Sequence, residues 1–232
     1  MHIEKTPTAL SAQKRSVFIP TDVTPLAVQH SKKQIYPKSC GATSLLCAAK
    51  ELGVHTLPVF PGSLSHTLGI DTLEMDNRCE TDIYMITSAS TTHRHQQSDM
   101  AQAGYSMPEN MVLAGRMLGL HMAIEEDPGV FSTALTWLYP QTRQKMSDMG
   151  CPIDAGCRQL KSNQIKIEAM AASILGIPAA LHWVVHRNDG SYMDPATGRN
   201  HKNFNELNAG IKRDIHQVVG YYKTGIAIIA TR

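Results

Sequence analysis

The segment from Gln34 to Gly53 constrains the fold of this chain more than any other part of the sequence. It places Cys40 just before a run whose apolar residues recur with helical spacing, and a glycine ends that run. A thiol in the first turn of a helix lies near unpaired N–H groups and the positive end of the helix dipole, which both favour thiolate. The Gln34 amide, six residues upstream, can donate a hydrogen bond to an oxyanion formed when that thiolate attacks a carbonyl. The segment therefore predicts a nucleophilic hydrolase.

A second segment supplies a candidate base and its orienting carboxylate. His182 lies in the predicted strand 179–186, and Asp194 ends the predicted strand 191–194 beyond an Asn-Asp-Gly turn signal. A hairpin that is symmetric about Asn188 places His182 directly opposite Asp194, with about 5 Å between the Cβ atoms. Asp194 then accepts from one ring nitrogen and leaves the other for the thiol. A shift of one residue in register would put the two side chains on opposite faces.

His186 is the rival base, because alternation places it on the same strand face as His182. It lies closer to the turn, where we expect exposure to solvent, and we therefore favour His182. The other four cysteines are interpreted as small buried apolar residues, since the total of five is odd and none forms a CxxC pair. They are Cys47, Cys79, Cys151 and Cys157. His93 and His95 are interpreted as part of a polar loop, and we expect no metal and no cofactor.

The order of the predicted elements indicates an α+β fold. Residues 1–30 are expected to form a loose N-terminal arm, and residues 31–232 a single domain. The predicted helices are the one after Cys40 and those at 108–119, 128–140, 159–175 and 203–211. The predicted strands are 83–87, 179–186, 191–194, 216–222 and 225–231. Helices thus come first and an antiparallel sheet follows.

Composition excludes several classes of protein. Apolar residues make up 42% of the chain and charged residues 18%, which is typical of a packed domain. The net charge of +2 argues against nucleic acid or an anionic membrane as the partner. The N-terminus lacks the apolar core of a secretory signal, and no apolar run is long enough for a membrane span. We therefore expect synthesis in a cytoplasm, with export open only to a system that reads no cleaved signal.

Two motifs carry a resemblance to a known family. Gln34–Gly53 resembles the nucleophile segment of papain-like cysteine peptidases, and in particular the Q-x5-C-G-x-x-x-L pattern of bacterial peptidases that remove double-glycine leaders and of their stand-alone relatives. His182-Trp-Val-Val, followed by Asp194-Pro195, is similar to that group's strand histidine and later Asp-Pro, although the gap between them is shorter here. The resemblance implies a papain-like fold, with Cys40 as nucleophile, His182 as base, Asp194 as orienter and Gln34 as oxyanion donor.

The resemblance also implies a reaction class and a setting. We expect a thiol peptidase that acts on a protein or peptide, and the stand-alone relatives indicate a secreted effector or toxin with an immunity or inhibitor protein as a further partner. A glutamine deamidase with the same Cys-His-Asp triad is the alternative, because the two activities share their chemistry and differ in the shape of the cleft. A non-catalytic binding module that retains the fold is the alternative from another class.

Overall fold

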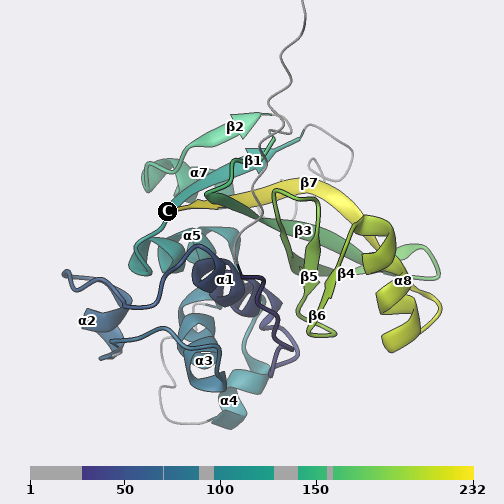
Figure 1. Ribbon diagram of the computed structural model, residues 1–232, viewed down its shortest axis with the longest axis horizontal. Coiled ribbons are helices and arrows are strands. Elements are labelled where there is room, and N and C mark those ends of the chain that lie inside the picture. Colours follow the sequence, from purple (N-terminus) through teal and green to yellow (C-terminus); the bar gives the residue numbers. More distant parts are fainter. Residues whose placement is uncertain (1–27, 70, 89–96, 128–140, 156–158) are drawn as a thin grey trace, which may run out of the picture.

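The computed structural model describes residues 28–69, 71–88, 97–127, 141–155 and 159–232 (Figure 1). Helices come first in the chain and pack against a seven-stranded sheet, and one later helix covers the opposite face of that sheet. The helices are α1 Cys40–Glu51, α2 Leu64–Leu68, α3 Asn77–Thr87, α4 Gln97–Gln102, α5 Pro108–Met117, α7 Thr142–Asp148 and α8 Phe204–Asp214. The strands are β1 His121–Glu126, β2 Ile153–Ala155, β3 Gln164–Ile174, β4 Ile177–His186, β5 Tyr192–Asp194, β6 Arg199–His201 and β7 Val219–Thr231.

Helix α1 is the centre of the helical layer. Every one of its residues is buried, because it contacts α3 and α5 on one side and strands β3 and β4 on the other. It begins at Cys40, as its sequence predicts, and Gly53 follows its end with a φ of 78° that favours glycine.

Helix α3 lies where we predicted a strand at 83–87, and that prediction was wrong. Asp76 caps the helix by accepting a hydrogen bond from the Cys79 N–H at 2.8 Å. The apolar run that favoured a strand is the buried end of this helix, since short apolar runs do not distinguish a strand from a buried helix.

Helix α5 confirms the prediction at 108–119, with Pro108 in its first turn. It packs closely on β1: a Cβ added at Gly115 would lie 2.5 Å from the Met122 side chain. A larger residue at this position would force the Met122 side chain to move. The predicted helix at 128–140 lies outside the described residues.

The strands follow the order β2-β1-β7-β3-β4-β5-β6, and all neighbours are antiparallel except β1 and β2. The prediction of a helix at 159–175 was wrong, because that stretch is largely strand β3. β3 lies between β7 and β4 and is buried on both faces from Ile165 to Ala171, so its apolar residues show no clean alternation. The two strands predicted at 216–222 and 225–231 are one strand, β7, whose register with β3 shifts opposite Glu168–Met170.

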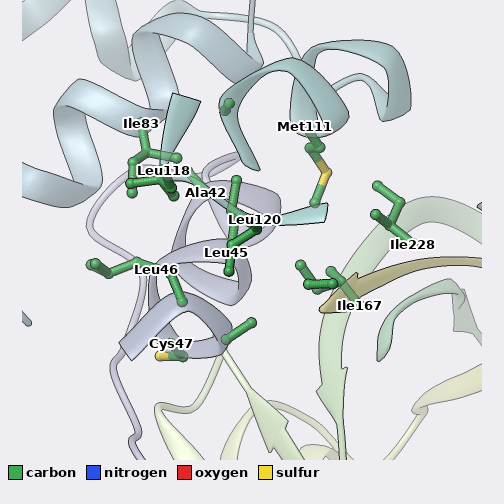
Figure 2. Close-up of a cluster of buried hydrophobic side chains, with 14 of the residues drawn as sticks. Ala42, Leu45, Leu46, Cys47, Ile83, Met111, Leu118, Leu120, Ile167 and Ile228 are labelled. Atoms are coloured by element: carbon green, nitrogen blue, oxygen red, sulfur yellow. The ribbon is translucent and has the colours of Figure 1, made fainter. Parts of the chain in front are cut away.

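Two apolar clusters flank the sheet. The larger lies between the helical layer and one sheet face, and Figure 2 shows members of it from α1, such as Leu45, and from the sheet, such as Ile167 and Ile228. The smaller cluster lies under α8 on the other face and consists of Met170, Val184, Tyr192, Leu207, Ile211 and Tyr221. Among the described residues, no helix has the length and apolar character to cross a membrane.

Candidate active site

Cys40 is the first residue of α1, and its side chain is almost fully buried, at 2% exposure. The residue before it, Ser39, does not cap the helix, because its hydroxyl donates to Glu80 Oε1 at 2.7 Å instead. The N–H groups of the first turn therefore have no side-chain cap. These groups and the positive end of the helix dipole can stabilise negative charge near the sulfur.

The His182 imidazole lies between Cys40 and Asp194. Its Nε2 is 2.8 Å from Asp194 Oδ1, and Cys40 is close enough for its charge to raise the pKa of the ring. Since Nε2 faces the carboxylate, Nδ1 is the nitrogen left for the thiol. Burial by itself lowers the pKa of His182, but the charge of Cys40 and the hydrogen bond and charge of Asp194 raise it to about 10. This environment favours the protonated imidazolium.

Asp194 is fully buried at the end of β5 and keeps its charge. Burial raises the pKa of its carboxyl, but the His182 hydrogen bond and charge and the Ala196 N–H lower it below its usual range. The Ala196 N–H donates to Oδ1 at 2.9 Å, and the Thr197 hydroxyl donates to Oδ2 at 3.3 Å. The Asp-Pro-Ala-Thr sequence thus supplies its own donors to the carboxylate.

The hairpin register differs from the symmetric one that we predicted. Val185 pairs with Met193 and His186 with Tyr192, a shift of two residues. His182 and Asp194 are therefore diagonal neighbours and not directly opposite. Both side chains stay on one face because side-chain direction in a strand repeats every two residues.

Tyr221 on β7 completes the surroundings of this pair, and the sequence analysis did not identify it. Its ring stacks on the His182 ring, with 5.1 Å between the centroids and 9° between the planes. Its hydroxyl lies 3.4 Å from each Asp194 oxygen, and burial and the Asp194 charge raise the pKa of the phenol, so it stays a donor. Asn208 of α8 holds its backbone, accepting from the Tyr221 N–H at 2.7 Å.

Gln34 lies beside the turn that leads into Cys40. Its N–H donates to Pro195 O at 2.9 Å, and its Nε2 donates to Tyr36 O at 2.8 Å. That contact uses one of the two Nε2 hydrogens and leaves the second for another acceptor. Within the described part of the chain, its buried Oε1 has no hydrogen-bond partner.

The segment that carries Gln34 is held by two buried carboxylates. Glu80 accepts from the Ile35 N–H at 2.9 Å and also pairs with Lys32. Glu51 of α1 accepts from the His30 N–H at 2.8 Å. These contacts fix the segment on the helical layer, and its Gln34 N–H ties it to the loop after Asp194.

The remaining candidates from the sequence do not join this site. His186 Nδ1 is 3.2 Å from Glu168 Oε2 and its ring stacks on Tyr192, 4.2 Å between centroids. Burial raises the pKa of the three other described thiols, which belong to Cys47, Cys79 and Cys151. Cys157, His93 and His95 lie outside the described residues, and the residues that are described contain no group of three or more potential metal ligands.

A pocket lies between α5, the loop before it and the sheet, and its lining includes Ser106, Leu181 and Trp183. A Cβ added at Gly41, next to Cys40, would lie 2.5 Å from Ser106 Cβ, and the Trp183 indole donates to Ser106 O at 3.2 Å. Cys40, His182, Asp194 and Gln34 are not among the residues that line it. Leu181 and Trp183 are sequence neighbours of His182, but alternation along β4 directs their side chains to the opposite face of the strand.

A thiol at a helix N-terminus, joined through an imidazole on a strand to a buried carboxylate, defines a cysteine hydrolase of the papain-like kind. The family model described as "Invasion plasmid antigen J, cysteine protease" matches residues 32–232. Cysteine protease IpaJ of Shigella flexneri is 46% identical over 201 residues, which cover 87% of this chain and 78% of that protein. The chain belongs to this family of cysteine proteases. The prediction of a thiol peptidase with an α+β fold is thereby confirmed.

Proposed function

We propose that Cys40, His182 and Asp194 form the catalytic triad of this cysteine protease and that Gln34 assists them. The observation that carries the proposal is the His182 ring, which is hydrogen-bonded to the buried Asp194 carboxylate at 2.8 Å and whose pKa is raised by the neighbouring Cys40. The raised pKa of His182 keeps a proton on the ring for the leaving amine while the sulfur is a thiolate.

The reaction begins when the Cys40 thiolate attacks the carbonyl carbon of a substrate amide. The oxyanion that forms accepts hydrogen bonds from the Cys40 N–H and from the second Nε2 hydrogen of Gln34. His182 then donates its proton to the nitrogen as the carbon–nitrogen bond breaks, leaving a thioester on Cys40. Water, deprotonated by His182, attacks the thioester and releases the acid.

Asp194 orients the ring and stabilises its charge throughout this cycle. Tyr221 is a positioning residue, because it contacts Asp194 and His182 and acts on the reaction through them. Its hydroxyl adds a donor to the carboxylate, and its ring fixes the plane of the imidazole.

A polypeptide is the substrate that we propose, and the support is the matching family's description as a cysteine protease. Support for the setting comes from the family's description as an invasion antigen. We include in the proposal delivery as an effector by a specialised secretion system, one catalytic domain over residues 31–232, and control by an inhibitor or immunity protein. The predicted N-terminal arm 1–30 lies, up to residue 27, outside the described residues. Kinship with the double-glycine-leader peptidases also stays a prediction.

The test compares three forms of the full chain in a whole-cell extract. Wild type and Cys151→Ala, which removes another buried thiol, are expected to produce the same new protein fragments, and Cys40→Ala none. Fragments from the Cys40→Ala protein would contradict the assignment of the nucleophile. A mass increase of about 1 Da on an intact target would show deamidation instead, because hydrolysis of a carboxamide replaces nitrogen by oxygen.

A further inference from the structure

The tip of the β3–β4 hairpin exposes a group of large apolar side chains. Ten such side chains, apolar or aromatic, are exposed in the described part of the chain, and five of them gather here. They are Ile174, Leu175 and Ile177 of the hairpin, Ile215 after α8, and Tyr222 of β7, and together we call them the apolar tip. The Leu175 N–H donates to Val218 O at 2.9 Å, which joins the hairpin to the loop after α8. A Cβ on Gly176 would lie 3.9 Å from the Tyr222 hydroxyl.

Leu175 is unsuited both to its backbone and to its surroundings. Its φ is 53° and that of Gly176 is 80°, so both turn residues have the positive φ of a two-residue type I′ hairpin turn. Such turns favour Asn-Gly, and leucine is strained there. The side chain is also 75% exposed, so packing does not compensate for the strain. The demands of folding therefore do not account for a leucine at this position, which points to a role in binding.

Lys212 and Arg213 lie exposed in the last turn of α8, directly before Ile215 of the apolar tip. Asp214 offsets the charge of Arg213, since it lies 2.9 Å from it. Lys223 follows Tyr222, but its ammonium lies 3.5 Å from Glu168 Oε1 and donates to the Tyr192 hydroxyl at 2.8 Å, so it does not face the tip. Lys212 is therefore the cation beside the apolar tip that can meet an anionic headgroup.

We propose that the apolar tip inserts into the surface of an anionic lipid bilayer. An aliphatic apex of Ile174, Leu175 and Ile177 would lie in the hydrocarbon, and Tyr222 and Lys212 behind it would lie at the level of the interface and the headgroups. A two-residue turn presents much less surface than the roughly 800 Å² per partner of a stable protein–protein interface. His182 lies five residues along β4 from Ile177, about 17 Å in an extended strand. Binding at the tip thus holds the active site close to a membrane surface.

The test uses the full chain and sedimentation with two kinds of vesicle, phosphatidylcholine alone and phosphatidylcholine with phosphatidylserine. We expect wild type to bind the anionic vesicles and to bind neutral ones more weakly. Leu175→Asn creates the Asn-Gly pair that this turn favours, so it should keep or raise Tm while weakening vesicle binding by at least about tenfold. Leu113→Gln removes an exposed leucine from α5 and is expected to bind as wild type does. Lys212→Gln should weaken binding to the anionic vesicles only.

The following results would contradict the proposal. Wild type that stays in solution with both vesicles, or Leu175→Asn that binds as well as wild type, would overturn it. Concentration-dependent dimers that Leu175→Asn abolishes, without vesicle binding, would assign the apolar tip to a second copy of the chain. Alkylation of Cys40 by iodoacetamide should proceed equally in every variant, which separates this test from that of the proposed function. If Leu175→Asn lowers Tm, Ile177→Thr provides the same test on the adjoining strand.

Discussion

The hydroxyl and the ring of Tyr221 are expected to contribute separately to activity. Tyr221→Phe removes the donor that lies 3.4 Å from both Asp194 oxygens but retains the ring against His182. A hydrogen bond to a charged group contributes about 1.5–3 kcal/mol at good geometry, and at 3.4 Å we expect about 1 kcal/mol. A loss of that size in positioning lowers kcat/KM by about fivefold.

Tyr221→Leu also removes the ring. A buried aromatic face stabilises an adjacent cation by about 1 kcal/mol, so its loss lowers the pKa of His182. Because His182 must hold a proton to release the amine, activity falls as pH rises through that pKa, which is about 10 in the wild type. The basic limb of the pH–rate profile should move down by about 0.7 pH unit in Tyr221→Leu and stay in place in Tyr221→Phe.

The assay is kcat/KM for a peptide substrate measured across pH, with Tyr222→Phe as the matched control. Tyr222 is the next residue on β7 and is exposed, so its hydroxyl should have no effect on the reaction. Equal rates for Tyr221→Phe and wild type would refute the role of the hydroxyl. An unmoved basic limb in Tyr221→Leu would refute the role of the ring, and a loss of rate in Tyr222→Phe would show that the effect is not specific.

Three further predictions concern the triad and its support. His182→Ala should lower peptide hydrolysis by about 10²–10⁴-fold, measured by steady-state kinetics, because no proton reaches the leaving amine. The raised pKa of His182 contributes stability that is full below its ordinary value of 6.5 and is lost as pH rises through about 10, so Tm of the wild type should fall over that range and Tm of His182→Ala should fall less. Glu80→Gln should destabilise the fold by about 1–3 kcal/mol in urea unfolding and lower kcat more than it changes KM, because it loosens the segment that carries Gln34. Glu74→Gln, an exposed carboxylate, is its control and should change neither.

Local signals account for much of what the sequence predicted correctly. Cys40 begins α1 and Pro108 lies in the first turn of α5, because helix starts and stops are fixed by neighbouring residues. The Asn-Asp-Gly turn closes with a hydrogen bond from the Gly190 N–H to Arg187 O at 3.0 Å. Such features depend on a few adjacent residues and can be read without knowledge of the fold.

Segments that are buried on both sides could not be assigned in this way. Strand β3 and helix α3 were each predicted as the opposite type, and in both the apolar residues are set by layers on either side rather than by one exposed face. The hairpin register was also missed by two residues, and the pairing of His182 with Asp194 survived because an even shift keeps the face.

The sequence alone determined that a thiol would begin a helix and that an imidazole and a carboxylate would share one face of a hairpin, since both follow from local periodicity. Only the tertiary structure decided what surrounds them. Tyr221 reaches Asp194 across 27 residues because β7 lies beside β3 and α8 fixes its backbone, and Glu80 reaches the Gln34 segment across 45 residues. Contacts of this range depend on which elements become neighbours in space, and no local pattern in the chain encodes that choice.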